Sequence, residues 1–88
     1  MTAAAHADDE RDQELARGAL LEGRIRPLAE ITEMVRPHLP GTILGVEIEV
    51  EDKGTIVYEF DVLDTDGRLK EVEVDAATGM ILKIEDQD

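Results

Sequence analysis

Residues 42–85, TILGVEIEVEDKGTIVYEFDVLDTDGRLKEVEVDAATGMILKIE, decide the fold of this chain. Apolar and acidic residues alternate along most of the stretch, which is the period of a β-strand with one buried and one solvated face. Four strands are predicted. Their alternating sets are Val46, Ile48, Val50 against Glu47, Glu49, Glu51; Tyr58, Phe60, Val62 against Glu59, Asp61; Val72, Val74 against Glu71, Glu73, Asp75; and Met80, Leu82, Ile84 against Ile81, Lys83, Glu85.

Short turn signals separate the four predicted strands. These are Asp52-Lys53-Gly54, Asp64-Thr65-Asp66-Gly67 and Asp75-Ala76-Ala77-Thr78-Gly79. Asp side chains accept local backbone N–H bonds, and glycine adopts the positive φ that tight turns need. Connections this short join neighbouring strands, so the sheet is predicted to be an antiparallel meander. Lys70 falls in the inward set of its strand, which suggests a bulge nearby.

Upstream of the strands the apolar period becomes helical. Leu15 and Ala19, with Leu20 and Leu21 beside them, predict a helix from Glu10 to about Gly23. Pro27 suits the first turn of a second helix, and Pro37 would end it near Arg36. The predicted fold is α+β, with two short N-terminal helices packed on one face of a four-stranded antiparallel meander sheet.

The boundaries follow from the same patterns. We expect residues 1–9 to be a disordered leader, residues 10–85 a single domain, and residues 86–88 a frayed tail. Ala5-His6-Ala7 before an acidic run is typical of the end of a secretory signal peptide, whose basic and hydrophobic regions are missing here. An ordinary alanine-rich leader is the simpler interpretation. No apolar run is long enough to cross a membrane, so no membrane insertion is expected.

Composition excludes several classes of function. The chain has 22 acidic and nine basic residues, a net charge of −13, which disfavours nucleic acid and anionic membranes as partners. Serine and cysteine are absent, and the two histidines, His6 and His38, lack partners at catalytic or metal-ligand spacing. Arg68 occupies the position where a calcium loop starting at Asp64 needs a ligand. We therefore predict no enzyme, no cofactor and no assigned metal site.

The acidic sheet face is the strongest candidate binding surface. Alternation along the strands gathers its carboxylates on one side, opposed mainly by Lys83. A solvated face that discourages aggregation is the simplest interpretation; docking of a basic partner is the functional one. Crowding should raise carboxyl pKa values and make stability fall as pH rises. The candidate partner-binding residues are Glu47, Glu49, Glu59, Asp61, Glu71 and Glu73.

Two alternatives to protein docking remain open from the residues. The carboxylate density is compatible with divalent-cation binding, although no closed ligand loop is present. A structural homo-oligomer is the other, formed through strand edges or through an exposed patch containing Val57, Leu63 and Ile81.

Residues 18–84 resemble the PepSY domain. The matching points are a Pro-Leu helix start at Pro27, Gly41, the run Val46–Glu49, the strand Tyr58–Val62, and two turns. The turn residues that carry the resemblance are Asp66, Gly67, Asp75, Ala76, Thr78 and Gly79.

The resemblance implies a small non-catalytic module of the cell envelope. PepSY domains occur in propeptides of thermolysin-type metallopeptidases and in secreted or periplasmic regulators, and no catalytic residues are assigned to the family. It implies a protein partner, a peptidase or an envelope sensor, and a periplasmic or secreted location. No protease domain accompanies the motif here, so any inhibition is expected to act in trans.

Overall fold

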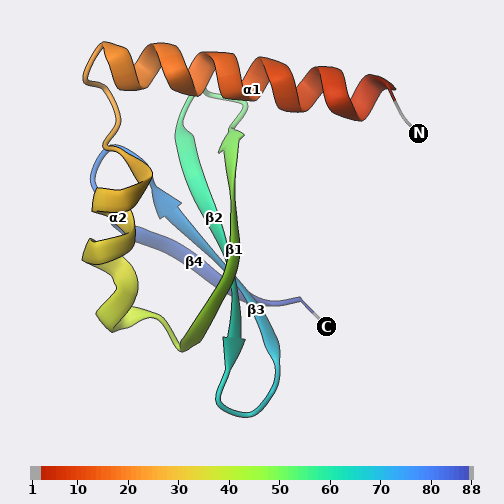
Figure 1. The fold of residues 1–88 in the computed structure, drawn as a ribbon, viewed down its shortest axis with the longest axis vertical. Coiled ribbons are helices and arrows are strands. Elements are labelled where there is room, and N and C mark those ends of the chain that lie inside the picture. Colours follow the sequence, from red (N-terminus) through yellow and green to blue (C-terminus); the bar gives the residue numbers. More distant parts are fainter. Residues whose placement is uncertain (1–2, 88) are drawn as a thin grey trace.

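The computed structural model describes residues 3–87, with side chains from residue 10 onward. Two helices, α1 (Ala3–Leu21) and α2 (Leu28–Val35), precede a short 3₁₀ turn, η1 (Arg36–His38). Four strands follow, β1 (Gly41–Val50), β2 (Ile56–Asp64), β3 (Leu69–Asp75) and β4 (Ile81–Asp86). They form one antiparallel sheet in the order β1-β2-β3-β4, which confirms the predicted α+β meander (Figure 1).

Helix α1 differs from the prediction at its start and in its buried face. It begins at Ala3 rather than near Glu10, so the expected disordered leader is wrong for residues 3–9; alanine has the highest helix propensity and extends the helix towards the N-terminus. Met1 and Thr2 lie outside the described residues. Ala16 and Ala19 are the buried residues, whereas Leu15 is 49% exposed. Small side chains on that face allow α1 to approach the sheet closely.

The second helix follows the sequence signals closely. Pro27 caps α2 in an extended conformation, and the helix gives way at Arg36 to the 3₁₀ turn that contains Pro37. Ile31 and Val35 are fully buried. Gly23, with φ of +76°, ends the preceding helix as expected.

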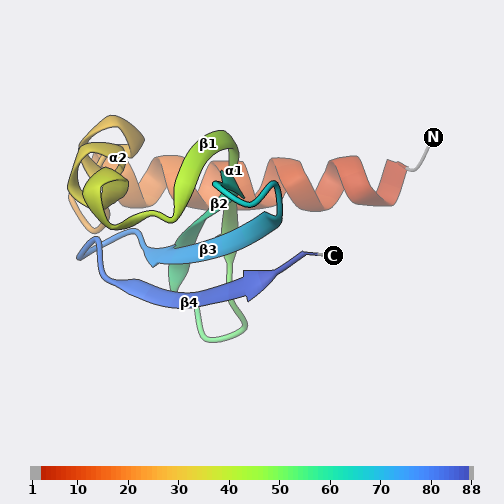
Figure 2. The ribbon, with the colours of Figure 1, turned by 90° about the horizontal axis from the view of Figure 1, so that it is seen from below.

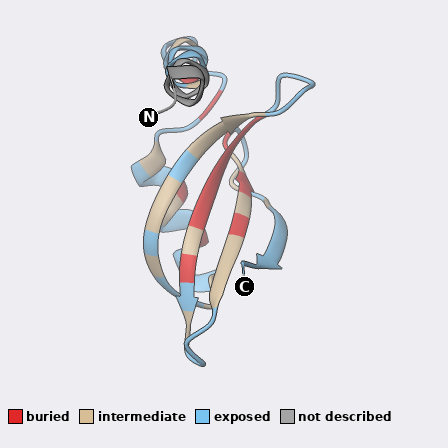
Figure 3. Cartoon of the chain, turned by 90° about the vertical axis from the view of Figure 1, so that its right-hand side faces the viewer, coloured by how far each residue is buried: buried red, intermediate tan, exposed pale blue. Residues whose placement is uncertain are grey.

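Both helices lie on the same side of the twisted sheet. α1 crosses the end of the sheet that carries the β1–β2 hairpin, and α2 covers the inward face (Figures 1 and 2). The core is aliphatic except for Tyr58 and Phe60, and burial is concentrated along β2 and β3 (Figure 3). β1 and β4 are the two edge strands of this sheet. The outward face of the sheet therefore has no helical cover.

Two register shifts correct the predicted facing of side chains. Lys70 pairs regularly with Val62, so no bulge occurs there; the shifts lie between Ile43 and Gly45, and between Glu73 and Val74 where β3 meets β4. The second shift pairs Val74 with Ile81.

That second shift places Ile81 against the core and leaves Met80 and Leu82 exposed, the reverse of the predicted alternation. An extra residue in one strand allows Ile81 and Ile84, three positions apart, to pair with inward-facing residues.

The predicted apolar oligomer patch does not exist as such. Val57 is 1% exposed and Ile81 packs against the core, which leaves Leu63 alone at 37% exposed. Val57 lies on the outward face but on the inner strand β2, where Glu49 and Asp75 flank it on either side. It lines a hollow of about 450 Å³ between the β1–β2 hairpin and Leu82.

The C-terminal end is also more ordered than predicted. Asp86 pairs with Lys70, whose Nζ donates to the Asp86 carboxylate at 2.5 Å. The Gln87 backbone N–H donates to the Leu69 carbonyl, and its side-chain amide donates to Asp61. The expected frayed tail is thus wrong for residues 86 and 87, because backbone and side-chain partners on β2 and β3 hold them; Asp88 lies outside the described residues.

Candidate functional site

The acidic sheet face is built from three rows of directly opposed residues. Its members all belong to the outward set of the strands. The rows are Glu49–Val57–Asp75, Glu47–Glu59–Glu73–Lys83 and Gly45–Asp61–Glu71–Glu85. This arrangement brings all six predicted partner-binding carboxylates onto one uncovered surface.

Like charges face one another across most of these rows. Glu59 lies between Glu47 and Glu73, and Glu71 lies between Asp61 and Glu85. Directly opposed like charges cost roughly 0.2–1 kcal/mol per pair. Lys83 is the one basic side chain in the three rows; it pairs with Glu85 at 3.5 Å, and Glu85 followed by Glu73 raises the pKa of Lys83. Lys83 therefore offsets the negative charge only near β3 and β4. The part of the three rows that lies on β1 has no basic side chain.

Glu59 is the one buried carboxylate of the three rows. It is 8% exposed, at the middle of the strand β2 that has neighbours on both sides. Desolvation, followed by repulsion from Glu49 and then Glu71, raises the pKa of Glu59 to about 7. Desolvation and repulsion from Glu51 and Glu73 likewise raise the pKa of Glu49. The predicted rise of crowded carboxyl pKa values therefore holds for these two residues.

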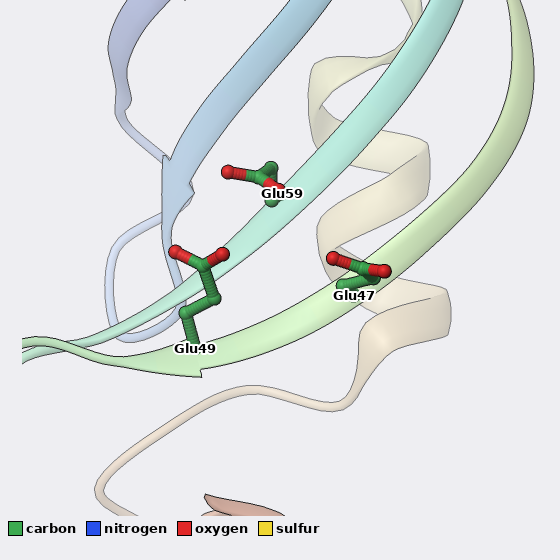
Figure 4. Close-up of side chains that lie close together, drawn as sticks. All are labelled: Glu47, Glu49 and Glu59. Carbon is green, nitrogen blue, oxygen red and sulfur yellow. The ribbon is translucent and has the colours of Figure 1, made fainter. Parts of the chain in front are cut away.

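Three carboxylates converge at one point of the face. One carboxylate oxygen from each of Glu47, Glu49 and Glu59 lies within 4.8 Å of the other two. Figure 4 shows the three side chains. Glu47 and Glu59 are directly opposed, and Glu49 stands two residues further along β1. Glu47 is exposed, Glu49 is half-buried and Glu59 is buried, so the group opens to solvent on one side.

The sequence predicted where these side chains face but not how deeply each is buried. Glu59 stood in the same alternating pattern as Asp61 and Glu73, and local periodicity carries no information on burial within the outward face. Its position on an inner strand is the signal that could have found it, because an inner strand is flanked by side chains on both sides.

The turn residues that carried the resemblance have structural roles. The Asp64 carboxylate accepts the backbone N–H groups of Asp66 and Arg68 at 2.9 Å, and Gly67 has φ of +81°. This is the tight hairpin turn that was expected.

The last turn is held in the same way and is joined to the helices. The Asp75 carboxylate accepts from the backbone of Ala77, and the Thr78 hydroxyl accepts from the backbone of Met80. Gly79 has φ of +81°. Ala76 is fully buried, and its carbonyl accepts the Arg26 N–H between α1 and α2.

A second hollow, which the sequence did not reveal, lies beside the edge strand β1. Its volume is about 610 Å³, and it lies between α1, the start of α2 and β1. Its lining combines apolar and acidic residues: Asp12, Gln13, Leu28, Val46, Glu47, Ile48, Glu49, Val50 and Tyr58.

The described residues hold no arrangement typical of nucleophilic or acid–base catalysis by histidine. His38 is exposed in η1, and the side chain of His6 is not among those described. None of the described helices is long and apolar enough to cross a membrane.

Comparison with known families places the whole sheet and α2 in one domain. The PepSY family, described as "Peptidase propeptide and YPEB domain", matches residues 27–85, from the cap of α2 to β4. The chain belongs to the PepSY family. No curated protein and no solved structure matched the chain.

Membership gives the coarse class of function. PepSY domains are generally non-catalytic, propeptide-like or inhibitor-like modules that interact with peptidases, and they are typically extracellular or periplasmic. The family match begins at Pro27, so α1 lies outside it, although Ala16 and Ala19 of α1 belong to the same core.

Proposed function

We propose that this PepSY chain is a non-enzymatic binding module that docks a cationic segment of a separate protein on its acidic sheet face. The partner is a peptidase or another envelope protein whose activity the docking modulates, and the location is periplasmic or secreted. Family membership supports the class of partner, and the acidic face supports the chemistry of recognition.

One observation carries the proposal. Both helices lie on the inward side of the sheet (Figure 2). The opposite face carries opposed carboxylates, with Lys83 as the one basic residue of its three rows. Such a field steers cationic partners and raises their association rate. A basic segment would also relieve the cross-strand repulsion that this face carries when free.

The part of the face best suited to direct contact is the row on β2, β3 and β4. Asp61 and Glu71 are half-buried and Glu85 is exposed, so their carboxylates are within reach of a partner. Glu59 is buried between its neighbours and contributes to docking mainly through its charge.

Affinity capture from an envelope extract of the source cell tests the docking surface. The double charge reversal Asp61→Lys with Glu71→Lys changes two directly opposed residues. The matched control is Glu10→Lys with Glu14→Lys, which changes the net charge equally on exposed positions of α1. We expect wild type and control to retain the same partner and the sheet variant to lose it.

Equal capture by all three proteins would exclude this face as the docking surface. A captured peptidase is then assayed with and without the purified chain. Reduced turnover by wild type and the control, but not by the sheet variant, is the result expected of a modulator. Unchanged turnover would reject modulation while leaving docking in place.

A further inference from the structure

We propose that Glu47, Glu49 and Glu59 form a binding site for one calcium-sized divalent cation at the β1–β2 end of the acidic sheet face. The inference goes beyond the docking function and does not depend on it. Figure 4 shows the three side chains, two from β1 and one from β2.

The spacing of the oxygens fits a single ion. Calcium binds carboxylate oxygens at about 2.3–2.6 Å, so two ligands on opposite sides of the ion are about 5 Å apart. One oxygen from each of Glu47, Glu49 and Glu59 lies within 4.8 Å of the other two. A single ion placed among them reaches all three without rearrangement of the strands.

The burial of Glu59 is a separate observation that points to a ligand. Residue Glu59 is 8% exposed, and within residues 10–87 no hydrogen bond or ion pair joins its carboxylate to another group, so that its oxygens have only a narrow contact with solvent. Buried carboxylates are normally hydrogen-bonded or paired with a cation. No group in the described part of the chain pairs with this carboxylate, and a bound cation would do so.

The charged groups around Glu59 do not neutralise its carboxylate. Glu47 and Glu73 face it directly across β1 and β3, and Glu49 and Glu71 are close enough to raise its pKa. The single lysine of its row, Lys83, lies beyond Glu73 and pairs with Glu85. Every charged group that acts on the Glu59 carboxyl is therefore another carboxylate.

The chemistry favours a hard divalent ion over a transition metal. All three ligands are carboxylates, which suit calcium and magnesium, and no cysteine exists in the chain. Bidentate glutamates supply up to six oxygens, and water completes the shell on the side where Glu47 is exposed. The three carboxylates lie on rigid strands and are buried to different depths. Calcium accepts such an irregular set of ligands, whereas magnesium requires a nearly ideal octahedron.

Calorimetric titration of the full chain with calcium chloride at pH 7.5 and 0.15 M potassium chloride tests the site. The ligand variants are Glu49→Gln with Glu59→Gln, and Glu47→Gln with Glu49→Gln, which retains Glu59. The matched control, Glu10→Gln with Glu14→Gln, removes the same charge from exposed positions of α1. Magnesium chloride is titrated in parallel.

We expect one saturable calcium site in wild type and control, at least tenfold weaker binding in both ligand variants, and weaker binding of magnesium. Non-saturating heat in wild type, or equal affinity in all four proteins, would overturn the proposal. Asp61→Lys with Glu71→Lys leaves the three ligands in place, so loss of partner docking and loss of calcium binding are separable.

Discussion

At the scale of single residues, Glu59 shows how a sheet can hold a carboxylate under electrostatic and solvation stress. It is 8% exposed between Glu47 and Glu73, and burial and repulsion raise its pKa to about 7. An ionised Glu59 is therefore favoured less in the folded chain than in the unfolded one. Folding and proton binding are linked at this side chain.

The linkage predicts how stability changes with pH. The folded pKa of about 7 lies above the ordinary value of 4.5, so the stabilisation from protonated Glu59 is complete below about pH 4.5 and is lost as pH rises through 7. Wild type should lose roughly 1–3 kcal/mol between pH 5 and pH 8, whereas Glu59→Gln, which cannot ionise, should lose less. Urea unfolding of wild type and Glu59→Gln at pH 5 and at pH 8, with a chelator present, measures the two losses.

The control for this prediction is Glu14→Gln on the exposed surface of α1. It removes the same charge without touching the sheet, and its pH dependence should match that of wild type. If Glu59→Gln shows the same loss as wild type, burial of Glu59 does not control the pH response.

Gly41 is a residue at which a single methyl group should be damaging. A Cβ at this position would lie 2.0 Å from the Leu63 carbonyl oxygen and 2.7 Å from the Asp64 Cα, both backbone atoms that cannot turn aside. Gly41→Ala should therefore cost about 1–3 kcal/mol in the free energy of unfolding. Gly45→Ala is the matched control, because its nearest neighbour is the Asp61 side chain at 3.9 Å. Equal stability of the two variants in urea would contradict the expected clash.

At the scale of elements, one hydrogen bond ties an inner strand to the connection between the helices. The Tyr58 hydroxyl donates to the Arg26 carbonyl at 2.9 Å, and Tyr58 is 2% exposed. The Arg26 N–H donates in turn to Ala76 after β3, and the Arg26 side chain reaches Ala77. Strand β2, the helix connection and the last turn thus meet at one backbone unit.

Removing the Tyr58 hydroxyl should weaken this joint without opening the core. Tyr58→Phe keeps the ring and leaves the Arg26 carbonyl without its side-chain partner, so we expect a loss of about 0.5–1.5 kcal/mol in the free energy of unfolding. The dependence of that free energy on urea should stay the same, because the buried area does not change. A variant as stable as wild type would show that the bond adds nothing to the anchoring of α2.

The elements also show how far sequence reasoning reaches. Alternation and turn residues predicted the strands, their order and the side on which Glu47, Glu71 and Glu73 lie, because these are local properties of the chain. The shift that turns Ile81 inward was not predictable, since it depends on which residue the core accepts opposite Val74. The burial of Glu59 and the convergence of three glutamates depend likewise on the assembled sheet.

At the scale of the whole molecule, the net charge of −13 is concentrated where strands oppose one another. Self-repulsion destabilises a compact state, and the thin core of a chain of this size has little stability to spare. The face that we propose as a docking surface should therefore make the free domain less stable than its packing alone would allow. A docked partner, a bound cation and added salt should therefore all stabilise the domain for the same physical reason, because each of them relieves this repulsion.

Salt isolates the general part of that response. Raising monovalent salt from 0.01 to 0.15 M shortens the screening length from about 30 to about 8 Å, so thermal stability at pH 7 should increase by several degrees. Tetramethylammonium chloride should act as well as potassium chloride, because the effect is screening and needs no ligand site. At pH 4, where many carboxylates are protonated, the gain should shrink. If the unfolding temperature at pH 7 does not change with salt, repulsion on the acidic sheet face is not a significant cost, and the energetic argument for docking a cationic partner there is removed.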